Sequence, residues 1–144
     1  MNLNLSITEN QVEIIKKYIK EQNFQQYVDG ITDQPSTLLI EEFSECFDDI
    51  EFGVPLLALE ATYKFLLTTN YLLWWDDAVE YNYEPIDNVL IYEDCMFATV
   101  AVSKKKEDTY MGNIVDGDDL DEDKREAFAE AMQSLIEFIL RLKR

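Results

Sequence analysis

Apolar residues recur at every third or fourth position along residues 9–22, which is the spacing of one helix face. The apolar positions are Val12, Ile15, Tyr18 and Ile19. Thr8 and Gln11 match a capping box, in which two side chains satisfy the free amides at a helix start. The pattern therefore predicts an amphipathic helix over 9–22. Residues 24–28 fit a short helix or a strand equally well.

A second helix is predicted after Asp33-Gln34-Pro35, because proline is favoured in the first turn of a helix. Its apolar face consists of Leu39, Phe43, Cys46, Phe47 and Ile50. Its opposite face is acidic throughout and consists of Glu41, Glu42, Glu45, Asp48 and Asp49. We expect one face to pack on a core and the other to face solvent.

Residues 56–67 are apolar almost all round, without the one-sided pattern of a surface helix. A helix with that pattern is buried on every side, so we expect a central buried helix here. Residues 71–82 are predicted as a second helix or a bent continuation of the first, since Thr68-Thr69-Asn70 weakens the helical pattern. Whether residues 56–82 form one helix or two stays open.

The pattern changes after Pro85, where β-branched and aromatic residues become frequent. Residues 89–92 and 96–102 have the composition of two strands, and Glu93-Asp94-Cys95 between them predicts a hairpin turn. Residues 109–115 can supply a third strand, with Gly112 as a bulge or turn. We expect a small antiparallel sheet over about residues 88–115.

The C-terminal segment has the clearest helical pattern. Acids crowd residues 116–123, and a helix is predicted from there to Leu142, capped by Asp116, Asp118 or Asp119. Its apolar stripe consists of Phe128, Ala131, Leu135, Ile139 and Leu142. Several N-terminal helices, a small antiparallel sheet and a long C-terminal helix make an α+β fold. The length and the scarcity of Gly and Pro favour a single acidic domain over residues 1–144.

The charge is large and unevenly distributed. Thirty acids against twelve bases give a formal net charge of −18, and the chain has no histidine. Residues 29–94 hold sixteen acids and one base, Lys64, so this stretch alone carries −15. Such a charge disfavours binding to DNA, RNA or anionic lipid, which require basic surfaces. It favours a basic protein as the partner, because complementary potentials attract.

Like charges lie one helical turn apart in this stretch, as Glu41 and Glu45 do. Each such pair costs about 0.2–0.5 kcal/mol on an exposed helix, so we interpret the acids as retained for binding. Tyrosine is enriched among the anchor residues of interfaces, so Tyr81 and Tyr83 join the candidates. The candidate partner-binding residues are Glu41, Glu42, Glu45, Asp48, Asp49, Asp76, Asp77, Glu80, Tyr81, Tyr83 and Glu84. The alternative is that the charge only keeps the chain soluble.

No pattern in the sequence points to catalysis. Without histidine there is no Ser-His-Asp or Cys-His machinery, and no Gly-rich phosphate loop is present. Asp119-x-Asp121-x-Asp123 followed by Glu130 resembles a calcium-binding loop, but Lys124 stands where that loop needs glycine. We therefore expect no enzyme activity, no cofactor and no dedicated metal site.

The two cysteines, Cys46 and Cys95, form no CxxC motif and no disulfide framework is expected, which favours a reducing compartment. The N-terminus lacks the basic and apolar regions of a signal peptide. Charges interrupt the apolar runs, so no membrane span is expected. We expect a cytoplasmic protein. Its oligomeric state stays open, and a homodimer is compatible with the sequence.

In composition and charge the chain resembles phage anti-restriction and anti-CRISPR proteins, and immunity proteins of nuclease toxins. No motif carries this resemblance, so it assigns no residues. The leading hypothesis is an inhibitor of the counter-defence type, a nucleic-acid mimic that binds the basic groove of a nuclease or another nucleic-acid-binding protein in place of DNA or RNA. One alternative is an immunity protein that neutralises a nuclease toxin. Another is a structural or housekeeping acidic domain with no inhibitory role.

Overall fold

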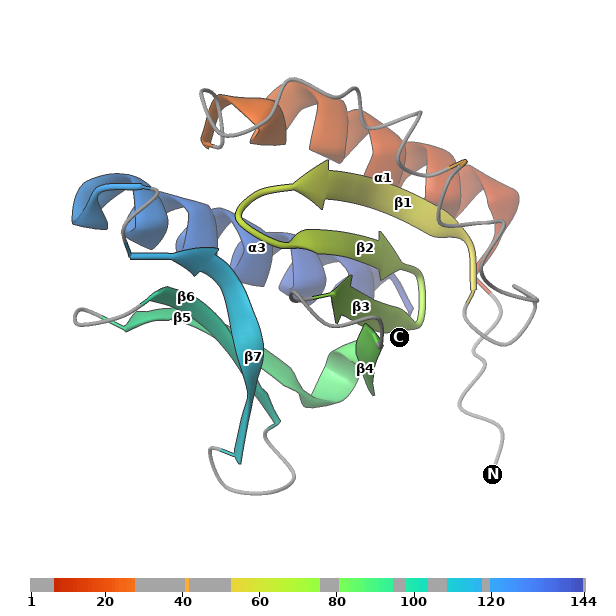
Figure 1. Ribbon diagram of the computed structural model, residues 1–144. Helices are drawn as coiled ribbons and strands as arrows, with labels where there is room; N and C mark the ends of the chain where they lie inside the picture. Colours follow the sequence, from red (N-terminus) through yellow and green to blue (C-terminus); the bar gives the residue numbers. More distant parts are fainter. Residues whose placement is uncertain are drawn as a thin grey trace.

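The computed structural model describes residues 7–27, 41, 53–75, 81–94, 98–103, 109–117 and 120–143. The elements are α1 (Glu9–Gln22), the 3-10 turn η1 (Phe24–Tyr27), β1 (Pro55–Glu60), β2 (Lys64–Thr68), β3 (Tyr71–Trp75), β4 (Tyr81–Pro85), the 3-10 turn η2 (Ile86–Asn88), β5 (Val89–Asp94), β6 (Ala98–Ser103), β7 (Thr109–Asp116) and α3 (Glu122–Leu142). Within the described ranges, α1 comes before and α3 comes after a run of strands that form two antiparallel sheets, and α1 lies beside β1 (Figure 1). The expected α+β class is confirmed.

Helix α1 has the predicted bounds and begins at the predicted capping box. The amide of Gln11 donates to Thr8 Oγ1 at 3.1 Å, and the amide of Thr8 donates to Gln11 Oε1 at 2.9 Å. The helix ends at Asn23, whose left-handed backbone (φ 49°) lets its amide bond back to the last turn. Val12 and Ile15 are buried, so the predicted apolar face does pack inward.

The first sheet has the strand order β1-β2-β3-β4, and every neighbouring pair is antiparallel. The prediction of helices over 56–67 and 71–82 is wrong, because β1, a turn and β2 occupy the first segment, and β3 and the start of β4 occupy the described part of the second. Leu57 and Leu59 belong to the main core, whereas Ala58, on the opposite face of β1, is also buried. A strand buried on both faces shows no alternation, so its continuous apolar run resembles that of a buried helix.

The second sheet has the strand order β5-β6-β7 and occupies the expected stretch of about residues 88–115. Gly112 itself pairs with Ala101, and the register of β6 and β7 shifts between this pair and the pair Val102–Tyr110, so the irregularity lies at Met111, next to the position expected. The turn expected at Glu93-Asp94-Cys95 starts later than predicted. Glu93 and Asp94 still pair with Thr99 and Ala98 as the last residues of β5.

Helix α3 reaches Leu142 as predicted, but its cap differs from those expected. Asp121 is the N-cap and accepts a hydrogen bond from the amide of Lys124 at 2.9 Å. Asp116 is instead the last residue of β7. Glu122 and Asp123 in the first turn and Arg141 in the last turn have the charges that the helix dipole favours.

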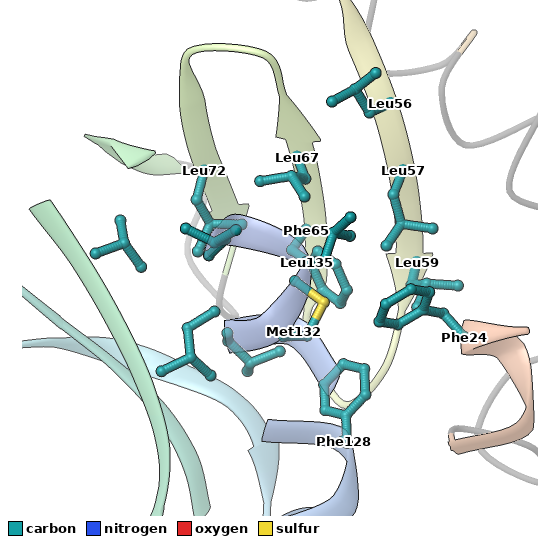
Figure 2. Close-up of a cluster of buried hydrophobic side chains, with 14 of the residues drawn as sticks. Phe24, Leu56, Leu57, Leu59, Phe65, Leu67, Leu72, Phe128, Met132 and Leu135 are labelled. Carbon is teal, nitrogen blue, oxygen red and sulfur yellow. The ribbon is translucent and has the colours of Figure 1, made fainter. Parts of the chain in front are cut away.

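One hydrophobic core joins α3 to both sheets and to α1. In Figure 2 the side chains of Phe128, Met132 and Leu135 point from α3 toward Phe65 and Leu67 of β2. All five are fully buried, and each such side chain contributes about 1.5–3 kcal/mol of transfer free energy. Helix α3 therefore supplies the common wall against which both sheets pack.

The two sheets also meet directly at the turn between β1 and β2. The amide of Tyr63 donates to the carbonyl oxygen of Ile114 at 3.2 Å, and the amide of Asp116 donates to Thr62 Oγ1 at 2.9 Å. The Tyr63 hydroxyl lies 3.2 Å from Asp116 Oδ2. These bonds fix the end of β7 against the turn of the first hairpin.

Within the described part of the chain, no helix combines the length and the apolar composition that crossing a bilayer requires.

Candidate functional site

Most of the predicted contact residues lie outside the described part of the chain. These are Glu42, Glu45, Asp48, Asp49, Asp76, Asp77 and Glu80. Glu41 is described, and it has helical backbone and an exposed side chain. The predicted helix around it otherwise falls outside the described residues, as do Cys46 and Cys95.

Strand β4 carries the three remaining candidates, Tyr81, Tyr83 and Glu84. Tyr81 pairs with Trp75 through the backbone. The Tyr83 side chain is 52% exposed and meets the Tyr71 ring edge-on, with 5.9 Å between the ring centroids. About half of Tyr83 is therefore accessible to solvent.

Glu84 is half-buried and accepts a hydrogen bond from Asn88 Nδ2 at 3.3 Å. Adjacent residues of a strand lie on opposite faces, so Tyr83 and Glu84 cannot belong to one flat contact surface. The structure thus separates two candidates that the sequence groups together.

A second acidic surface lies on α3, where the sequence pattern had indicated a core helix. Glu122, Glu126 and Glu130 are all exposed and follow one another at intervals of four residues. Residues at this spacing are neighbours on a helix surface, about 5–6 Å apart. The signal is readable in the sequence, because these glutamates lie on the side of the helix away from its apolar stripe.

The three glutamates line one side of a groove of about 530 Å³ between α3 and β5. Its other lining residues are Ile91, Glu93, Ala129, Gln133 and Ser134. The amide of Ile91 donates to Gln133 Oε1 at 2.9 Å, which fixes the strand to the helix at this point. The groove therefore combines an apolar floor with an acidic wall.

Glu93 forms a buried ion pair with Arg125 beside this groove. Arg125 Nη2 lies 3.0 Å from Glu93 Oε1, and both side chains are only 6% exposed. Arg125 Nε donates to the same oxygen at 3.1 Å, while Arg125 Nη1 donates to the carbonyl oxygens of Gly117 and Leu120. The guanidinium thus neutralises Glu93 and holds the chain that leads from β7 into α3.

The segment that resembles a calcium-binding loop has a different conformation. Residues 122–130 belong to α3, so Asp123 and Glu130 lie on a continuous helix and cannot close around an ion as loop ligands do. Among the residues that the structure describes, no three His, Cys, Asp or Glu side chains are grouped so as to hold a metal ion.

Comparisons of the chain with protein-family models, with curated proteins and with solved structures found no match. Function is therefore inferred from the residues of this chain.

Proposed function

We propose that the protein is an acidic inhibitor that binds the basic groove of a nucleic-acid-handling protein in place of DNA or RNA. The observation that carries this proposal is the charge of residues 29–94, which hold sixteen acids and one base on a chain with a net charge of −18. A cytoplasmic location, where such a partner would act, belongs to the same proposal.

The fold supports the proposal because it sets exposed acids on a well-packed framework. Among the described acids, those classed as exposed are Glu9, Glu13, Glu21, Glu41, Asp87, Asp121, Glu122, Asp123, Glu126, Glu130 and Glu137. Carboxylates one helical turn apart are spaced by about 5–6 Å. DNA presents one phosphate per about 3.4 Å of rise on each strand, with a further lateral offset, so the two spacings are similar. Lysine and arginine pair with either group.

The first experiment is capture of a partner on the immobilised protein from host and phage-infected lysates at low salt, followed by competition with duplex DNA or with RNA. An inhibitor of this kind releases its partner when nucleic acid is added. A partner that nucleic acid fails to displace contradicts the proposed mode of binding. A captured nuclease toxin that is displaced in the same way identifies the immunity-protein alternative.

The second experiment measures the association rate with that partner. We expect it to fall at least about tenfold between about 0.01 M and about 0.1 M salt, as the Debye length shortens from about 30 Å to about 10 Å. An association rate that does not depend on salt excludes steering by the acidic surface.

The third experiment changes Glu41, Glu45 and Asp48 together to lysine. We expect loss of inhibition with unchanged or higher thermal stability, because like-charge repulsion is relieved. The matched control changes Glu13, Glu21 and Glu137 to lysine, which alters the net charge by the same amount at exposed positions outside residues 29–94. Equal losses in both variants would assign binding to total charge alone.

A further inference from the structure

The groove between α3 and β5 presents carboxylates at two depths. Glu122, Glu126 and Glu130 are exposed along its wall, whereas Glu93 lines it with a side chain that is only 6% exposed. The apolar groups of Ile91 and Ala129, each 3% exposed, line the same groove. A ligand that fits must therefore carry positive charge and an apolar stem together.

Glu93 retains hydrogen-bonding capacity despite its ion pair. The two contacts from the Arg125 guanidinium, at 3.0 and 3.1 Å, both fall on Oε1. A carboxylate has lone pairs on both oxygens, so Glu93 can accept a further hydrogen bond from a donor that enters the groove. Because Arg125 already neutralises Glu93, the attraction for a cation comes from the three glutamates of the wall.

An arginine side chain satisfies these conditions better than a lysine does. Its guanidinium carries five N–H donors in a planar fork, so it can bond to Glu93 and to a wall glutamate at the same time. Its methylene stem can lie against Ile91 and Ala129 while the charge stays among the carboxylates. Lysine offers a compact ammonium group that cannot span the two depths in this way.

We infer that the α3–β5 groove receives an arginine side chain from a basic segment of the partner protein. This inference rests on the proposed function only in taking the partner to be basic. The groove would then be a second contact site, separate in sequence from the acidic stretch at residues 29–94, and it would select arginine-bearing segments.

The test uses fluorescein-labelled hexa-arginine and hexa-lysine peptides with the full chain at low salt. Fluorescence anisotropy gives the affinity, and amide chemical shifts of the ¹⁵N-labelled protein locate the peptide. We expect hexa-arginine to bind more tightly, with the largest shifts at Ile91, Glu93 and Gln133. Equal affinity for both peptides, or shifts spread evenly over the exposed acids, overturns the inference.

Two variants of the groove test separately whether arginine binding depends on its negative charge and on its open volume. Changing Glu122, Glu126 and Glu130 to glutamine should weaken hexa-arginine binding by roughly tenfold, since exposed ion pairs contribute between about 1.4-fold and 5-fold each. The control variant changes Glu9, Glu13 and Glu21 of α1 to glutamine, which removes the same charge at exposed positions away from the groove. Ser134→Trp keeps the charge and fills the groove, so it should also abolish the preference for arginine.

The outcomes also distinguish this inference from the proposed function. If Ser134→Trp binds hexa-arginine as the parent does, the groove is not the site, whatever the Glu41, Glu45 and Asp48 variant shows with the partner. The opposite result is also possible, in which the groove variants lose arginine binding but nucleic acid fails to displace the partner. That result supports the arginine site in the groove and contradicts the proposed function.

Discussion

The Nζ atom of Lys143 lies 2.8 Å from the carbonyl oxygen of Thr69 and 2.8 Å from Asn70 Oδ1. Residues more than seventy positions apart are thus joined, because Lys143 ends α3 and Thr69 and Asn70 form the turn between β2 and β3. The same turn is held from its other side, since the amide of Ile86 donates to the carbonyl oxygen of Asn70 at 2.9 Å. The Lys143 ammonium group therefore links the C-terminal end of α3 to the first sheet through two hydrogen bonds.

Replacing Lys143 should destabilise the fold and change how stability depends on pH. Lys143→Met removes both hydrogen bonds, and we expect it to lower the free energy of unfolding by about 1–3 kcal/mol. Burial lowers the pKa of Lys143 below its ordinary 10.5, while the charge of Asp87 acts in the opposite direction. Below pH 10.5 the unfolded chain therefore holds this proton more tightly than the folded chain does.

Stability of the parent relative to Lys143→Met should consequently rise as the pH increases through the folded pKa toward 10.5. Urea unfolding followed by tryptophan fluorescence at a series of pH values measures this difference. Subtracting the two proteins removes the pH dependence of all other groups. A difference that stays flat or shrinks over this range contradicts the buried environment of Lys143.

Replacing only one partner of the buried Arg125–Glu93 ion pair should strongly lower the free energy of unfolding. Arg125→Met leaves the Glu93 carboxylate buried without its counter-charge, and we expect a loss of about 3–5 kcal/mol in the free energy of unfolding. The double variant Arg125→Met/Glu93→Leu removes the stranded charge and should recover part of that loss. Thermal unfolding measured by circular dichroism compares the two. Equal instability would show that the bonds to Gly117 and Leu120 matter more than the ion pair.

Gly53 should not tolerate a side chain. Its φ of +89° lies in the left-handed region, and a Cβ atom there would collide with Thr69 Oγ1, which accepts a hydrogen bond from the amide of Val54. We expect Gly53→Ala to cost about 2–4 kcal/mol from backbone strain and overpacking together. The same change in a Thr69→Ala background should cost about 1 kcal/mol less, since the nearest obstacle is gone. An equal cost in both backgrounds would assign the whole effect to φ.

Tyr83 should contribute to partner binding and little to stability. Because its side chain is 52% exposed, Tyr83→Ala should change the free energy of unfolding by less than about 1 kcal/mol. If Tyr83 is an anchor for the partner, affinity should fall about tenfold or more, as measured by calorimetry. Ile14→Ala is the control, because Ile14 is a comparably exposed apolar residue on α1 at 43%. Unchanged affinity for Tyr83→Ala removes this residue from the contact surface.

Helices α1 and α3 were predictable because their signals are local. Thr8 and Gln11 are three residues apart, and the side chain of each caps a backbone amide of the other, so the start of α1 can be found within one turn. The turn between β1 and β2 has no such signal, since Ala61-Thr62-Tyr63 contains no Gly, Pro or Asn. Its bonds go to Ile114 and Asp116, more than fifty residues further along the chain.

Only part of the candidate surface was predictable, because the sequence signals identify residues but not the faces on which they lie. The charge pattern identified Glu41, and the enrichment of tyrosine at interfaces identified Tyr83; both are exposed in the structure. Neither signal could assign neighbouring residues to faces once the helix over 71–82 was wrongly predicted. Alternation along β4 separates Tyr83 from Glu84. The row of Glu122, Glu126 and Glu130 was missed because the acids of this segment were interpreted as a helix start and as a resemblance to a calcium-binding loop, not as a surface of α3.

Contacts between the first and last described helices affect how the protein folds during synthesis. Gln11 Nε2 donates to the carbonyl oxygen of Leu142 at 2.8 Å, across 131 positions of sequence, and α3 forms a wall of the core for both sheets. The strands made earlier therefore have no complete apolar surface to pack on until α3 has left the ribosome. Nascent chains should expose their buried leucines until α3 emerges, so chaperone occupancy in the cell is expected to persist until residues near 142 have left the ribosome.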